Sequence, residues 1–146
     1  MNLTEHFSME EFITTQHRGI DNSLPDNLLD TARQTCEMLE RIRTALAGLP
    51  IIVTSGFRCD ELNRVIGSKP GSDHPKAMAV DFKCPEFGTP YAVCQQLAPM
   101  MDELGIGQMI YEFSSWIHVS TRKPDKAVNR ILTISARGTE TGIRKA

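Results

Sequence analysis

Residues 71–83 have the sequence Gly71-Ser72-Asp73-His74-Pro75-Lys76-Ala77-Met78-Ala79-Val80-Asp81-Phe82-Lys83. The glycine, proline and small polar residues of the first half predict a loop, and the alternation that follows predicts a strand from Met78 to Lys83. Because side chains alternate along a strand, Val80 and Phe82 would share one face and Asp81 would lie on the other. A carboxylate at the centre of a strand requires a polar or charged partner, so we expect one beside Asp81.

Two later segments alternate in the same way and predict a β-hairpin around Ser114-Ser115, with strands at 108–113 and 116–120. Glu112 and His118 would lie on the faces opposite the apolar residues of these strands. Two histidines and one aspartate with an open fourth position are the ligand set of a catalytic zinc site, and His74, Asp81 and His118 are the candidates for it. The same spacing also fits histidines that are only hydrogen-bonded in a core or at a surface.

The N-terminal half has a helical period. Ser8 and Glu11 form a capping box between Phe7 and Phe12, which predicts a short helix. A longer helix is predicted over residues 25–47, where apolar residues recur at three- and four-residue steps. The remaining predicted elements are a strand at 51–54, a short helix at 60–66, a helix at 89–104 with a break at Pro99, and a strand at 130–135.

Helices in the first part of the chain and consecutive strands in the later part favour the α+β class. We therefore expect an antiparallel sheet of four or five strands, with helices on one face and a zinc cleft on the other. A chain of 146 residues, 40% of them hydrophobic, fits one domain. We expect this domain to span residues 1–136, and we expect 137–146, rich in glycine, threonine and charge, to be a flexible tail.

Composition and charge exclude several classes of protein. The formal net charge of −2 argues against a general nucleic-acid binder, which has a basic excess. No run approaches the roughly 18 apolar residues of a membrane span. The four cysteines form no CxxC pair and predict reduced thiols, although counting alone leaves a disulfide open. The first residues show no secretory signal, so we expect synthesis in the cytoplasm.

Three ordered motifs resemble those of one family. Residues 72–81 resemble the Ser-x-His-x-x-Gly-x-Ala-x-Asp motif of the zinc D-Ala-D-Ala carboxypeptidase family, with Ala77 where the motif has glycine. This family shares a structural group with the lysostaphin-type peptidases and the hedgehog signalling domain. Thr54-Ser55-Gly56-Phe57-Arg58 is similar to the Ser-Gly-Tyr-Arg segment before that motif, and Trp116-Ile117-His118-Val119-Ser120 resembles the segment with the third metal ligand. The likeness covers roughly residues 5 to 135.

The resemblance implies roles for individual residues. His74, Asp81 and His118 would bind Zn²⁺, Arg58 would contact the substrate carbonyl or carboxylate, and Ser72 would support the site and its substrate. Many relatives carry the catalytic acid/base two or three residues before the third ligand, where this chain has Trp116 and Ser115.

Glu112, six residues before His118, is then the first candidate for the base. It needs an irregular turn to reach His118, because a two-residue turn at Ser114-Ser115 would pair it with Ile117. Asp73 is the second candidate for the base. Alternatively, Glu112 is only an exposed strand carboxylate.

The function implied by the resemblance is a zinc metallopeptidase that cleaves stem peptides or cross-links of bacterial peptidoglycan. Because no basic cluster marks a pocket for a terminal carboxylate, we favour an endopeptidase over a carboxypeptidase. The alternative is a catalytically silent zinc-binding domain, and a metal-free fold is a third hypothesis. We expect a monomer with no nucleic-acid partner, acting on the cell wall as a phage lysin or as part of a virion.

Overall fold

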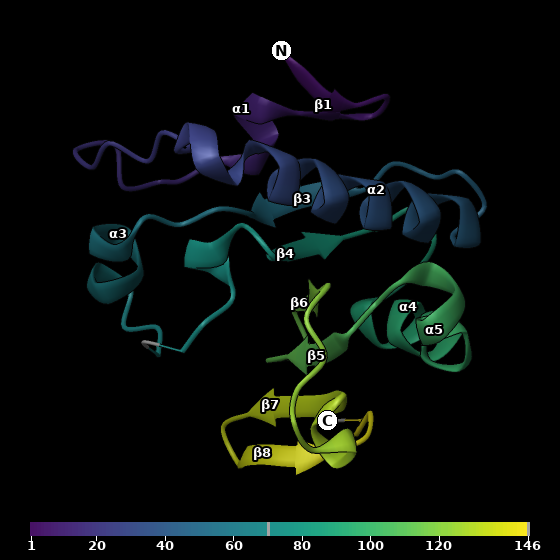
Figure 1. The fold of residues 1–146 in the computed structure, drawn as a ribbon. Helices are drawn as coiled ribbons and strands as arrows, with labels where there is room; N and C mark the ends of the chain where they lie inside the picture. Colours follow the sequence, from purple (N-terminus) through teal and green to yellow (C-terminus); the bar gives the residue numbers. More distant parts are fainter. Residues whose placement is uncertain (70, 146) are drawn as a thin grey trace.

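The computed structural model describes residues 1–69 and 71–145, and its main feature is a six-stranded sheet (Figure 1). The strands follow the order β3 (Ile52–Ser55), β4 (Ala79–Lys83), β6 (Trp116–Ser120), β5 (Gln108–Glu112), β7 (Ile131–Ser135) and β8 (Gly138–Thr141). Neighbouring strands are antiparallel except β5 and β7, which are parallel. The α+β class is confirmed, whereas the expectation of an antiparallel sheet of four or five strands was wrong.

The parallel pair arises from a long-range contact at the start of β7. Residues 121–130 include the short 3₁₀ turn η4 (Ala127–Asn129) and connect the end of β6 with the start of β7, which lies on the other side of β5. There the guanidinium of Arg130 donates to the carbonyl oxygens of Gly107 and Ile106, at 3.0 and 2.8 Å. The start of β7 is therefore fixed beside the start of β5, and the two strands run in the same direction.

The C-terminal segment differs from the flexible tail that we predicted for 137–146. Strand β8 pairs with β7 over four residue pairs, from Leu132 opposite Thr141 to Ser135 opposite Gly138. Gly138 has a φ of 101°, a backbone conformation that glycine adopts at little cost. The part of this segment within the described residues ends at Lys145, and Ala146 lies outside them.

The N-terminal elements form as their sequence predicts, with one addition. The capping box of Ser8 and Glu11 is present at the start of α1 (Met9–Phe12). Two short strands precede it, β1 (Asn2–Thr4) and β2 (Phe7–Ser8), which pair with each other. The predicted long helix is a 3₁₀ turn, η1 (Asp26–Leu28), followed by α2 (Leu29–Ala45). The apolar stripe of α2 is buried, namely Ala32, Cys36, Met38, Leu39 and Ile42.

The other helical segments connect the strands. They are α3 (Asp60–Val65), the 3₁₀ turn η2 (His74–Lys76), α4 (Pro90–Leu97), η3 (Ala98–Met100) and α5 (Met101–Leu104). The change from α-helix to 3₁₀ turn at Ala98 confirms the break that Pro99 predicts. The four cysteines are free, and three of them, Cys36, Cys84 and Cys94, are buried.

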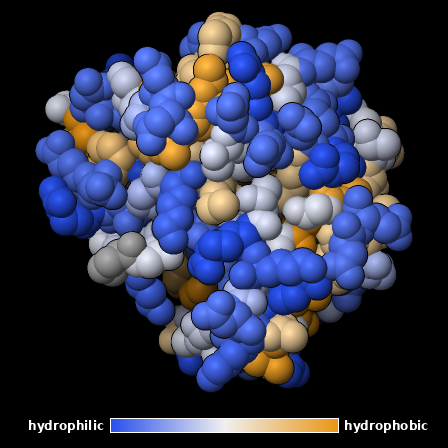
Figure 2. Space-filling view, viewed as in Figure 1, coloured by the Kyte–Doolittle hydropathy of each residue, from blue (hydrophilic) through white to orange (hydrophobic). Residues whose placement is uncertain are grey.

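The core lies on the face of the sheet that carries Val80 and Phe82 of β4 and Ile117 and Val119 of β6, all fully buried. These side chains pack in one cluster with the buried residues of α2 and α4. Figure 2 shows hydrophilic side chains over most of the face seen in Figure 1, with hydrophobic ones in small groups. Within the described residues, no helix has the length and apolar character that a membrane span requires.

Candidate metal centre

The pairing of β4 with β6 places Asp81 directly opposite His118. Both residues alternate with core residues, so their side chains lie on the face opposite Phe82 and Ile117. His74 comes from η2, just before β4, and its Nε2 lies 3.3 Å from Oδ1 of Asp81. Nδ1 of His118 lies 2.9 Å from the same oxygen. The three side chains are buried, and their ligand atoms all lie within 4.8 Å of one another. They form a group that could hold a metal ion.

The orientation of His74 is fixed by a backbone carbonyl. Its Nδ1 donates to the carbonyl oxygen of Gly56 at 2.6 Å, so in the neutral imidazole Nε2 carries the free lone pair. Nε2 is buried and makes no hydrogen bond within the described residues. A metal-ligating histidine usually donates its other N–H in this way, so the ring fits a metal ligand. Gly56 is required here because a Cβ would lie 2.3 Å from the carbonyl oxygen of Phe12.

The backbone of the loop before β4 explains why the family motif has glycine where this chain has Ala77. Ala77, where the motif has glycine, ends η2 with φ 59° and ψ 24°, the left-handed region. Its carbonyl oxygen accepts a hydrogen bond at 2.7 Å from the hydroxyl of Thr35 on α2. The hydroxyl of Ser72 accepts a hydrogen bond from the backbone N–H of His74 at 3.2 Å. Ser72 thus supports the backbone of a candidate ligand, and its predicted contact with substrate stays a prediction.

The three side chains shift one another's pKa values. Burial raises the pKa of Asp81, but the charges of His74 and His118, together with the hydrogen bond of His118, outweigh burial and hold the pKa well below its usual range. Burial lowers the pKa of His74. Burial also opposes the charged form of His118, yet the hydrogen bond and charge of Asp81 raise its pKa. Asp81 is therefore a carboxylate, the form that binds a cation.

Glu112 reaches His118 through a turn that begins one residue earlier, and is one residue longer, than predicted. The turn lies at Phe113 and Ser114, with φ of 51° and 55°, and the N–H of Ser115 donates to the carbonyl of Glu112 at 2.9 Å. The predicted two-residue turn at Ser114-Ser115 was wrong, because Phe113, Ser114 and Ser115 together form a three-residue turn between the paired residues Glu112 and Trp116. Glu112 consequently pairs with Trp116 and not with Ile117.

This register makes Glu112 a diagonal neighbour of His118, and its Oε1 lies 3.9 Å from Nδ1 of His118. The Glu112 side chain is 17% exposed, so it is neither a solvent-exposed strand carboxylate nor a fully buried one. Burial, together with the negative charge of Asp81, raises the pKa of Glu112 to about 6. A carboxylate with a pKa near neutrality can both accept and return a proton at working pH.

Asp73, the second candidate for the base, is already engaged. Its Oδ2 accepts a hydrogen bond from the hydroxyl of Ser120 at 2.8 Å, and its Oδ1 accepts one from Nε of Arg122 at 2.6 Å. Only 4% of the Asp73 side chain is exposed. The network therefore ties the loop that carries His74 to the end of β6. The sequence analysis missed Ser120 and Arg122, because their link to Asp73 depends on strand pairing.

Arg58 lies beside the group, as the motif predicts. One of its terminal nitrogens, Nη2, is 3.8 Å from Oδ2 of Asp81, and its backbone N–H donates to the carbonyl of His74 at 3.3 Å. Burial lowers the pKa of the guanidinium, while Asp81 and Glu112 oppose this shift. Its Nε is buried and makes no hydrogen bond within the described part of the chain.

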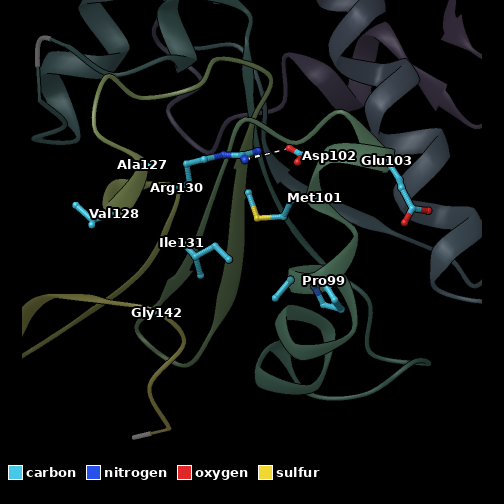
Figure 3. Close-up of a pocket in the computed structure, with 10 residues that line it drawn as sticks. Pro99, Met101, Asp102, Glu103, Ala127, Val128, Arg130, Ile131 and Gly142 are labelled. Atoms are coloured by element: carbon cyan, nitrogen blue, oxygen red, sulfur yellow. Dashed lines mark ion pairs between the residues drawn. The ribbon is translucent and has the colours of Figure 1, made fainter.

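A cavity of about 670 Å³ lies apart from these side chains, between the η3–α5 segment and β7 (Figure 3). Its walls include Met101, Ile131 and the ion pair between Nη1 of Arg130 and Oδ1 of Asp102, at 3.0 Å. No member of the metal-binding group lines it. We therefore give this cavity no part in the metal centre.

The comparison with known families agrees with this geometry. No curated protein matches the chain. The model of the family Peptidase M15 matches residues 5–120, which include the three candidate ligands, Arg58 and Glu112. This match covers well over half of the chain and most of the six-stranded sheet. The chain therefore belongs to the Peptidase M15 family.

Proposed function

We propose that this protein is a zinc metallopeptidase that cleaves peptide bonds in the stem peptides or cross-links of peptidoglycan. Membership of Peptidase M15 implies a peptidase. The observation that carries the proposal is the buried group of His74, Asp81 and His118, in which Nε2 of His74 makes no hydrogen bond within the described residues. Peptidoglycan as the substrate rests on the motif resemblance.

The donor set fits zinc. Two imidazole nitrogens and one carboxylate oxygen are typical protein ligands of a catalytic zinc ion, which keeps its fourth position open. When bound by such a set, zinc supplies Lewis acidity that activates water for attack on a carbonyl carbon. The hydrogen bond from His74 to Gly56 fixes the ring that would hold the ion.

Two further side chains would carry out the proton and charge steps. Glu112 accepts a proton from the attacking water and later donates it to the amine that leaves, so its charge is restored at the end of the cycle. The guanidinium of Arg58 donates hydrogen bonds to the substrate carbonyl oxygen as negative charge develops on it. The position of both groups beside Asp81 and His118 supports these roles.

Hollows on both sides of the ligands support endopeptidase action. A cavity of about 180 Å³ adjoins Arg58, walled by residues 14–17, the end of β3 and α3. A second hollow, of about 570 Å³, adjoins Lys83 at the other end of β4. A substrate that crosses the metal centre along β4 would have room on both sides of the bond that is cut. The further proposal of a phage lysin or virion component rests on the family resemblance alone.

Cleavage of purified peptidoglycan tests the proposal, with the released fragments identified by mass spectrometry. Addition of a chelator should abolish fragment release, and zinc should restore it. New amino and carboxyl ends inside the stem peptides would identify an endopeptidase, whereas release of single D-alanine would identify a carboxypeptidase. A zinc-loaded protein that releases no fragment would instead support the alternative, a silent zinc-binding domain.

A further inference from the structure

We infer that Lys83 binds a carboxylate of the substrate on the side of the scissile bond away from Arg58. This inference rests on the proposed function, since it concerns the peptide that the metal centre would cleave. It assigns a specificity-determining contact to a residue that neither the motifs nor the metal-binding group includes.

The sheet register places Lys83 in line with the metal centre. Lys83 follows Asp81 by two residues on β4, and Phe82 between them is fully buried in the core. Lys83 and Asp81 therefore share the face opposite the core, about 7 Å apart along the strand. The pairing of β4 with β6 ends at Phe82 opposite Ile117, so Lys83 is the first residue of β4 beyond it, and on the other side Lys83 pairs with Ile52 of β3.

Lys83 and Arg58 lie on opposite sides of Asp81. Strand β3 runs antiparallel to β4, with Ile52 opposite Lys83 and Ser55 opposite Asp81. Arg58 is three residues beyond Ser55, and its backbone N–H bonds to the carbonyl of His74 before the start of β4. A peptide along β4 would therefore meet one cationic side chain on each side of the bond that is cut.

The ammonium of Lys83 is free to take a ligand. Among the described residues no carboxylate lies within ion-pair distance of it, although Lys83 is only half-buried. It borders the hollow of about 570 Å³, together with Pro85, Gly88, Thr89, Ser114 and Ser115. Apart from Lys83, no charged residue lines this hollow.

The chemistry of this hollow selects an anion. An ammonium group offers only donors, and it forms its strongest hydrogen bonds with ionised oxygen acceptors. Stem peptides of peptidoglycan carry carboxylates at two kinds of position, along the peptide and at its C-terminus. Both sources share the same chemistry, so the experiment has to separate them.

The test uses the stem pentapeptide L-Ala-γ-D-Glu-meso-diaminopimelate-D-Ala-D-Ala in three forms. In the first form all carboxylates are free, in the second the internal carboxylates are amidated, and in the third only the C-terminal carboxylate is amidated. Binding to zinc-loaded Glu112→Gln protein is measured by calorimetry, and cleavage by the wild type is measured as kcat/KM. The same peptides are bound to the Glu112→Gln protein that carries Lys83→Met, Lys83→Arg or, as a matched control, Lys126→Met on the exposed 121–130 segment.

Loss of the carboxylate that Lys83 recognises should weaken binding about tenfold, the effect of one charge-assisted hydrogen bond. Weaker binding of the second form identifies an internal carboxylate, and weaker binding of the third form identifies the C-terminus. Lys83→Met should remove the preference, Lys83→Arg should restore it, and Lys126→Met should leave it intact. Equal binding of the three forms, no binding of any form, or a preference that survives Lys83→Met would overturn the assignment. A preference in binding without any cleavage would instead count against the proposed function alone.

Discussion

Oε1 of Glu112 lies 3.9 Å from Nδ1 of His118, although the two residues are on different strands and are not direct partners. Glu112 pairs with Trp116, and His118 pairs with Ile110, so Glu112 and His118 are diagonal neighbours on one face of β5 and β6. The three-residue turn from Phe113 to Ser115 sets this register. A two-residue turn at Ser114-Ser115 would pair Glu112 with Ile117 and move it away from the candidate metal centre.

The position of Glu112 predicts the effect of removing its proton acceptor. Glu112→Gln keeps the shape of the side chain, so zinc content should match the wild type. Turnover of the stem peptide should fall by about 10²-fold or more, because an amide cannot act as a general base. Glu103→Gln, at an exposed helix position, is the matched control and should leave turnover unchanged. Wild-type turnover by Glu112→Gln would show that another group is the base.

The convergence of His74, Asp81 and His118 predicts that each is needed to retain the metal. His118→Ala leaves only two of the three ligands, so purified protein should lose the zinc that elemental analysis finds in the wild type. His17→Ala, at an exposed position, should keep about one zinc per chain. Full zinc content in both His118→Ala and His74→Ala would show that the metal binds elsewhere.

Arg58 should matter more for the reaction rate than for substrate binding. If its guanidinium stabilises the charge that develops on the carbonyl oxygen, Arg58→Ala should lower kcat about 10²-fold on a peptide with a blocked C-terminus. KM should change much less. Arg64→Ala on the exposed side of α3 provides the control. A variant in which only KM rises would assign Arg58 to ground-state binding, as expected for a carboxypeptidase.

The grouping of the three candidate metal ligands could be predicted from the sequence because it depends on local alternation. Asp81 and His118 each lie between core residues of a strand, and His74 belongs to the same motif as Asp81. The turn at Phe113 could not be predicted, since it places a bulky residue at a positive φ.

Long-range contacts account for the other differences. The parallel strand β7 depends on the contact of Arg130 with the carbonyls of Ile106 and Gly107. The role of Asp73 depends on the place of Ser120 at the end of β6. Neither contact leaves a pattern in the neighbouring sequence. The carbonyl that orients His74 is a backbone group of Gly56, so no residue type in the sequence reveals it. A glycine at the end of a strand can only indicate that another backbone segment approaches closely.

The ion pair of Asp73 with Arg122 should stabilise the loop that carries His74. Arg122→Met leaves the buried Asp73 with only the Ser120 hydroxyl as a side-chain partner, so the free energy of unfolding should fall by about 1–2 kcal/mol. Urea unfolding of the zinc-loaded protein measures this change. Lys123→Met, at the next position and also exposed, should have the wild-type midpoint. An equal midpoint for Arg122→Met would mean that solvent replaces the arginine without cost.

Activity as a function of added zinc tests most directly whether the group of His74, Asp81 and His118 is the centre of a metallopeptidase. Metal-free protein is titrated with zinc, and cleavage of peptidoglycan stem peptides is followed at each step. Cleavage should be absent at the start, rise in proportion to zinc, and level off at about one zinc ion per chain, as expected for a single site with three protein ligands. Cleavage by the metal-free protein at the full rate, or no cleavage at any zinc concentration, would contradict this function.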